Sequence, residues 1–90
     1  MRVYVLFDTA AGAYSNPVFA ETDEVVMRDL RAMLADELTA GSVLVVYPDE
    51  FALYYIGDYD PHTGVLTGVD HVKLCTCGAL MAPRSEVPDA

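Results

Sequence analysis

The chain has 90 residues, 53% of them hydrophobic, and a formal net charge of −9 from fourteen acidic and five basic side chains. This length fits one domain, and the hydrophobic content favours a folded core over disorder. The five basic residues are scattered, so the chain lacks the Lys/Arg cluster with which simple nucleic-acid binders displace counterions from phosphate.

The first predicted strands occupy residues 2–8 and 13–20. Residues 2–8 form a nearly continuous run of β-branched and aromatic side chains, which is typical of a central strand buried on both faces. Residues 9–12 are small and predict a turn. The segment 13–20 then pairs back, and because Pro17 cannot donate a ladder hydrogen bond, this second strand lies at an edge or is broken there.

The clearest predicted element is a helix over residues 22–40. Thr22 is suited to cap it, and acidic residues follow in the first turn, where the helix dipole favours negative charge. Gly41 suits its C-terminal end. We expect one apolar stripe of this helix to pack on the sheet, and the i, i+4, i+7, i+8 spacing assigns to it Val26, Leu30, Met33, Leu34 and Leu38.

The second half of the chain predicts a hairpin that follows an ambiguous apolar segment. Residues 43–47 are either a short strand or an apolar lid. Residues 51–59 predict a strand, and 60–64 carry turn chemistry, with a proline that fixes φ and a glycine that can adopt φ > 0. Residues 65–69 return as the partner strand, while 71–76 either extend this pairing or form a last edge strand.

The order β-β-α-β-β predicts an α+β fold with a small antiparallel sheet of four to five strands and one helix packed on one face. We expect residues 1–82 to form a single domain and the tail 83–90 to be disordered. The sheet face without a helix is then a candidate interaction surface. Apolar and amphipathic residues suited to such a surface are Tyr4, Tyr14, Val43, Val45, Tyr54, Tyr55 and Tyr59.

No motif carries a complete catalytic or metal-binding set. Asp58, Asp60 and His62 resemble the start of a calcium loop but lack its third acidic position and its distal glutamate. Cys75 and Cys77 supply at most two of the four ligands of a zinc site, and they are more typical of reduced, partly buried thiols. We therefore expect no enzyme activity, no metal and no cofactor.

The N-terminal apolar stretch is shorter than the core of a secretory signal, and no window reaches about 18 apolar residues. We therefore expect no signal peptide and no membrane span.

Several short motifs follow one another in a characteristic order and spacing over residues 3–77: Tyr4–Asp8, Gly12–Tyr14, Asn16–Ala20, Pro48–Phe51, Leu53–Tyr54, Ile56–Asp60 and Thr63–Leu66, with a helix carrying Arg28 between the third and the fourth. Together they resemble the small nonstructural protein family of gokushoviruses, microviruses with circular single-stranded DNA genomes that infect bacteria. The chain departs from that family at Val43–Val46, which is apolar here, and its Cys75–Cys77 ending is only loosely similar.

The resemblance implies a non-enzymatic protein that works in the cytoplasm of the infected bacterium and is absent from the virion. It implies a role in the switch from genome replication to single-stranded DNA synthesis and packaging. We expect binding to a viral or host replication or packaging protein, because an acidic chain also suits a basic protein partner.

Two further expectations concern the apolar and aromatic residues. Strand 51–59 is apolar on both faces, and residues 43–46 add more apolar surface, so we expect a homo-oligomer that buries them. The alternative is that residues 43–46 fold back and close the core within one chain. An alternative function is a single-stranded DNA-binding module in which bases stack on an aromatic sheet face, although the net charge opposes it.

Overall fold

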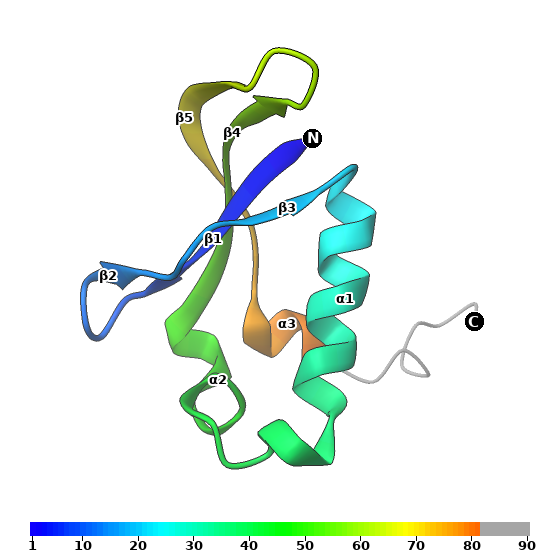
Figure 1. Cartoon of the computed structure of the whole chain (residues 1–90). Coiled ribbons are helices and arrows are strands. Elements are labelled where there is room, and N and C mark those ends of the chain that lie inside the picture. Colours follow the sequence, from blue (N-terminus) through cyan, green and yellow to red (C-terminus); the bar gives the residue numbers. More distant parts are fainter. Residues whose placement is uncertain (82–90) are drawn as a thin grey trace, which may run out of the picture.

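A computed structural model describes residues 1–81 (Figure 1). The strands are β1 (Arg2–Asp8), β2 (Ala13–Tyr14), β3 (Val18–Ala20), β4 (Phe51–Asp60) and β5 (Val65–Thr76). The α-helices are α1 (Asp23–Ala35), α2 (Val43–Val46) and α3 (Cys77–Met81), and the 3-10 turns are η1 (Glu37–Thr39) and η2 (Pro48–Glu50). These elements confirm the predicted α+β class with an open antiparallel sheet. The tail predicted to be disordered lies outside the described residues.

The sheet has the order β2-β1-β4-β5, and β3 pairs with β1 beyond a break in the edge strand. The central place of β1 confirms the prediction from its apolar run, and three consecutive residues within it are buried. The second predicted strand divides into β2 and β3 on either side of Ser15–Pro17. At this break the N–H of Ser15 donates to the Leu6 carbonyl at 2.8 Å, and its hydroxyl accepts from the Leu6 N–H at 2.9 Å.

A bulge in β4 decides which of its side chains face α1. Tyr4 of β1 opposes Tyr55, but the residue before Tyr4 opposes Gly57, so β4 contains one extra residue between the two pairs. Beyond the bulge the alternation of faces reverses. Tyr59 therefore lies on the same face as Tyr54, although a regular strand would place them on opposite faces.

The β4–β5 hairpin depends on two glycines. Gly64 has a φ of +74° and donates its N–H to the Asp60 carbonyl at 2.7 Å, which confirms the predicted turn. At Gly57, a Cβ would stand 2.5 Å from the carbonyl oxygen of Thr67, so only glycine lets the two strands approach at the bulge. After the turn, β5 continues unbroken to Thr76, and residues 71–76 therefore extend the hairpin.

Helix α1 begins as predicted but ends at Ala35, five residues before the predicted end. The Thr22 hydroxyl accepts the N–H of Val25 at 3.2 Å. At the other end, Asp36 adopts extended angles, and its carboxylate accepts the N–H of Leu38 at 2.9 Å, which starts η1 instead of another helical turn. The predicted stripe is therefore confirmed for Val26, Leu30 and Leu34 but wrong for Leu38, which is 93% exposed, and for Met33, which is 37% exposed.

The core lies between the sheet and the helices. Residues 43–46 form the short helix α2 and not a strand, and they fold back on the core, against which Leu44 and Val45 pack. The prediction of a single helix also missed α3, which packs beside α1 and supplies two buried side chains. The core residues are Tyr4, Ala20, Val26, Leu30, Leu34, Phe51, Leu53, Cys77 and Leu80. Within residues 1–81, every helix is too short or too polar to cross a membrane.

The contrast between Leu34 and Leu38 tests this core. Leu34→Ala should lower the free energy of unfolding by about 2–5 kcal/mol, because Leu34 is buried and its truncation leaves a cavity. Leu38→Ala is the matched control and should change it by less than about 0.5 kcal/mol, because this side chain is exposed. Urea denaturation measures both. Equal effects of the two substitutions would contradict the observed end of α1.

Candidate interaction surface

The face of the sheet turned away from α1 carries a continuous set of apolar and aromatic side chains, and we call it the open face. Val5 and Phe7 of β1 lie on it, since they alternate with Tyr4, which faces α1. Tyr54 pairs with Val5, and Tyr14 pairs with Phe7, so these tyrosines share the face. None of these residues belongs to the core that the helices cover.

Four rings form an aromatic cluster on the open face: Phe7, Tyr14, Tyr54 and His71. The ring centroids lie 4.6 Å apart for Phe7 and Tyr14, and 6.4 Å for Phe7 and Tyr54. His71 closes the circle at 5.7 Å from Tyr14 and 6.3 Å from Tyr54. The four rings thus come from four strands, β1, β2, β4 and β5, and Tyr14 is still 55% exposed within the cluster.

A hollow of about 250 Å³ lies on the same face, toward the other end of β1. Phe19 borders it with 46% of its surface exposed, and its ring contacts Tyr59 edge-on at 5.8 Å. The other lining residues are mostly apolar or glycine: Val3, Pro17, Ile56, Gly57, Leu66, Thr67 and Gly68. The open face therefore offers an aromatic cluster and an apolar hollow side by side along β1.

A second pocket of about 310 Å³ lies on the opposite side, between α1 and β3. Leu30 and Met33 of α1 line it together with Val18 and Ala20 of β3. The rest of its lining is mostly apolar, with Asp29 and Ser15 as the polar residues, which is few for the convergent polar groups that usually orient a bound small molecule.

Charge is distributed unevenly around these features. Among the basic residues in the described part of the chain, Arg2 pairs with Asp23 and Arg28 pairs with Asp29. Lys73 lies opposite Tyr54 and is the one described cation that the strand register places on the open face. The surface is therefore poor in positive charge for a protein that would contact a phosphate backbone.

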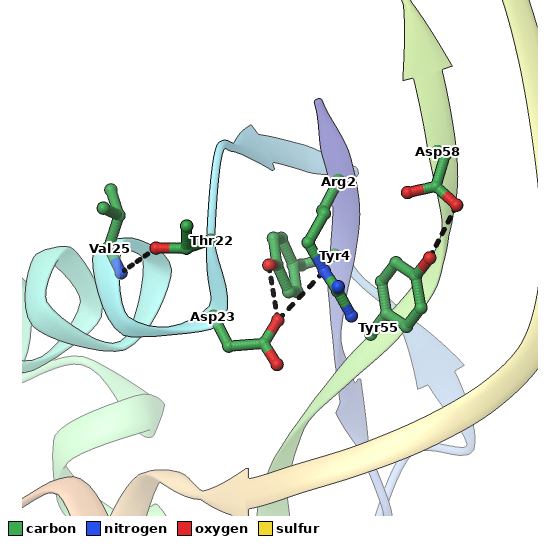
Figure 2. A network of polar contacts seen from close by, with 7 residues as sticks. All are labelled: Arg2, Tyr4, Thr22, Asp23, Val25, Tyr55 and Asp58. Carbon is green, nitrogen blue, oxygen red and sulfur yellow. Dashed lines mark hydrogen bonds and ion pairs between the residues drawn. The ribbon is translucent and has the colours of Figure 1, made fainter.

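On the helix side, a polar network joins β1, α1 and β4 (Figure 2). The Tyr4 hydroxyl donates to Asp23 Oδ1 at 2.7 Å, and Arg2 Nε lies 3.1 Å from the same oxygen. The Arg2 guanidinium stands 3.8 Å from the centroid of the Tyr55 ring, and the Tyr55 hydroxyl donates to Asp58 at 2.6 Å. The network holds the start of α1 against the sheet.

These contacts shift the tyrosine pKa values. Burial and the hydrogen bond to Asp23 raise the pKa of Tyr4 far above its ordinary value. The hydrogen bond to Asp58, together with burial, raises the pKa of Tyr55. Both hydroxyls therefore stay protonated and act as donors that stabilise neighbouring carboxylates.

Neither the two cysteines nor the candidate calcium motif forms a metal site within residues 1–81. Cys75 and Cys77 are both free thiols, and burial raises the pKa of Cys77 to about 11. In the incomplete calcium-like motif, Asp58 accepts from the Tyr55 hydroxyl and Asp60 accepts the backbone N–H of His62 at 2.9 Å. Across residues 1–81, no group of three or more His, Cys, Asp or Glu side chains is placed to hold a metal ion.

Comparison with known protein families identifies the family of the chain. The model of the phage ORF5 protein family matches residues 1–80. The chain belongs to this family. No curated protein and no solved structure shows significant similarity to it. The sequence resemblance to bacteriophage proteins is thereby confirmed over nearly the whole length of this phage ORF5 family protein.

The fold separates the residues predicted to form one surface. Tyr14, Tyr54 and Tyr59 of this phage ORF5 family protein do lie on the open face. Tyr4 does not: its side chain is fully buried in the core. Tyr55 faces α1 beneath Arg2, so strand alternation excludes it from the open face as well.

The two valines of the predicted surface belong to α2, away from the open face. Val43 is exposed, whereas Val45 packs against the core. Prediction from the sequence also missed Phe7, Phe19 and His71, which complete the aromatic set. The alternation of Phe7 with Tyr4 was available in the sequence, but the contact of His71 with Tyr14 joins residues far apart in the chain.

The polar network predicts a specific response to alkaline pH. Tyr4→Phe should lower the free energy of unfolding at pH 7 by about 1–3 kcal/mol, because it removes a hydrogen bond to a carboxylate. An unfolded tyrosine ionises near pH 10, whereas folded Tyr4 keeps its proton. Stability that Tyr4 supplies below pH 10 is therefore lost as the pH rises further, because the folded state then binds more protons.

The cost of Tyr4→Phe should accordingly shrink between pH 9 and pH 11, as measured by urea denaturation. Tyr47→Phe, at a tyrosine that is 55% exposed, is the control and should leave the pH profile of the parent unchanged. A cost of Tyr4→Phe that stayed constant across this range would contradict the raised pKa.

Proposed function

We propose that this protein is a non-enzymatic phage protein that acts by binding a viral or host protein of replication or packaging through its open face. The observation that carries this proposal is a set of aromatic and apolar side chains on a face that no described helix covers, of which Tyr14 and Phe19 are about half exposed. Contiguous exposed apolar surface of this kind marks interaction sites, and tyrosine is enriched among the residues that dominate binding energy.

The family and the gokushovirus resemblance support a more specific role. We propose that the protein belongs to the gokushovirus nonstructural proteins, works in the cytoplasm of the infected bacterium and stays out of the virion. Its binding would regulate the switch from genome replication to single-stranded DNA synthesis and packaging. A binding protein suits this role because it can bias a shared machinery without catalysing a step.

Capture from infected bacteria tests the proposal. The tagged full chain should retain a phage or host replication or packaging protein, identified by mass spectrometry. Tyr14→Asp should reduce the capture at least about tenfold, because it places a charge in the aromatic cluster, and the loss of a hot-spot residue costs about 2 kcal/mol or more. Tyr47→Asp, equally exposed but outside the open face, is the control and should capture like the parent.

Melting curves of both variants establish that they are folded. Failure to retain any such protein, or equal capture by Tyr14→Asp, would overturn the proposal.

We also propose that the protein forms a homodimer along β5. Within residues 1–81, β5 pairs with β4 alone, so the outer edge of a twelve-residue strand has no partner. Its exposed side chains include Val65, Leu66, Val69 and Val72. An unpaired strand edge with apolar side chains is a template for pairing with a second chain, most often about a two-fold axis.

Light scattering at about 10–100 μM covers the concentrations at which weak dimers form. The parent should show about twice the chain mass of 9.8 kDa, and Val72→Lys should shift it toward the monomer, because lysine on an edge opposes pairing. A mass near 9.8 kDa for the parent across this range would rule out the dimer.

The aromatic cluster also favours a second candidate function, binding of single-stranded DNA by base stacking. The net charge of −9 and the single lysine among the described open-face residues oppose it. A gel shift with a short oligothymidine at low salt decides. No shift at tens of micromolar protein would exclude this function.

A further inference from the structure

We infer that the partner presents to the open face a proline-rich segment in the polyproline II conformation. Proline rings of that segment stack on the aromatic cluster, its backbone carbonyls accept hydrogen bonds from tyrosine hydroxyls, and one aliphatic side chain enters the hollow beside Phe19. This inference rests on the proposed function and names the chemistry of the partner.

The open face carries little charge of its own, although the chain has a net charge of −9. Arg2 and Asp8 alternate along β1 with the same side of the sheet as Tyr4, and Asp58 pairs with Arg2, so all three charges lie on the helix side. Within residues 1–81, Lys73 is the one charged residue that the strand pairings place on the open face. A largely uncharged segment therefore suits this face better than an ionic one.

The tyrosine hydroxyls of this face are hydrogen-bond donors without an acceptor. On the helix side, the hydroxyls of Tyr4 and Tyr55 each donate to an aspartate. Among residues 1–81, no acceptor is in place for the hydroxyls of Tyr14, Tyr54 and Tyr59, whose rings lie on the open face. Proline has a backbone carbonyl but no N–H. A proline-rich backbone therefore offers the acceptors that these hydroxyls lack, and it brings few donors of its own.

The middle of the open face offers side chains and no free backbone edge. β1 pairs with β2 and β3 on one side and with β4 on the other, so an added strand finds no ladder there. A polyproline II segment needs no ladder, and because it is already formed it loses little conformational entropy on binding. Such segments dock on exposed aromatic side chains, and the aromatic cluster, in which Tyr14 is 55% exposed, supplies that surface.

The hollow sets the spacing between the prolines and the aliphatic side chain. Gly57 and Gly68 pair at the hollow and contribute no side chain to fill it. Its volume of about 250 Å³ falls below the usual range of small-molecule pockets and suits one aliphatic side chain. Val3 lines the hollow and Phe7 belongs to the cluster, so about 13 Å of β1 separate the two features. A polyproline II segment spans this distance with about four residues.

A synthetic peptide tests the inference on the full chain. The probe is an uncharged nine-residue peptide of prolines and serines with blocked ends, in which a leucine stands four residues before a pair of prolines. Titration by NMR should move the signals of Tyr14, Tyr54 and Phe19. Added salt should leave the affinity unchanged, because none of the contacts joins two charges.

Matched peptides isolate the contributions of the segment. A peptide with alanine in place of every proline should bind about tenfold more weakly, because it regains N–H groups and conformational freedom. A peptide with serine in place of leucine should bind at least about threefold more weakly, because the hollow then stays unfilled.

Matched protein variants isolate the contributions of the face. Tyr14→Phe keeps the ring and removes the donor, and it should weaken binding about two- to tenfold. Tyr14→Ala also removes the ring and should weaken binding further. Tyr47→Phe and Tyr47→Ala, at an equally exposed tyrosine outside the open face, should bind like the parent. Melting curves establish that the variants are folded.

Equal binding of the proline and alanine peptides, or equal binding by the parent and Tyr14→Ala, would overturn the inference. Tighter binding of oligothymidine than of the proline peptide would overturn it in favour of nucleic acid. If capture from infected cells depends on Tyr14 but the proline peptide neither binds nor competes, the proline-rich partner is wrong and the proposed function stands. If the peptide binds but no replication or packaging protein is captured, the proposed function is wrong and the proline-binding face stands.

Discussion

The Asp23 carboxylate is the contact on which the arrangement of this fold depends. It accepts the hydroxyl of Tyr4 and pairs with Arg2 at the point where the chain leaves β3 and enters α1. Because Tyr4 is buried at the centre of the sheet, this contact places the start of α1 over the middle of β1. The helix then covers one face and α3 packs beside it, while no helix of residues 1–81 covers the opposite face (Figure 1).

The bulge in β4 determines what the open face contains. Without it, Tyr59 would share a face with Tyr55 and point toward the helix side. With it, Tyr59 meets Phe19 on the open face, and Gly57 lets β5 approach closely enough to form the hollow. One inserted residue therefore moves Tyr59 to the face of Tyr54, while Tyr55 stays on the helix side.

The aromatic rings of the open face and the negative charge of the protein favour different ligands, and the proposed function follows from comparing the two. Aromatic rings accept both nucleic-acid bases and cationic side chains. Phosphates, however, need compensating positive charge, and the described basic residues are few and partly paired with carboxylates. The same negative charge that opposes DNA strengthens the attraction of a basic protein segment.

The sequence by itself determined the class of the fold, the central place of β1, the start of α1 and the glycine turn of the hairpin. Each depends on local chemistry: an apolar run, a capping threonine, a glycine that accepts positive φ. The end of α1 was not predicted because the apolar spacing continues to Leu38. In the structure, the Asp36 carboxylate accepts the backbone N–H of Leu38, and this ends the helix. Residues 43–46 became helical because Leu44 and Val45 could then reach the core.

Only the tertiary structure decided which tyrosines belong to the candidate surface. Tyr4 and Tyr54 have similar strand surroundings in the sequence, yet one is buried beneath α1 and the other lies on the open face. His71 joins Tyr14 across a separation of 57 residues, and no local pattern encodes that meeting. The physical reason is that side-chain alternation only divides each strand between two faces. Strand register, one bulge and the position of α1 decide which residues lie on the covered face.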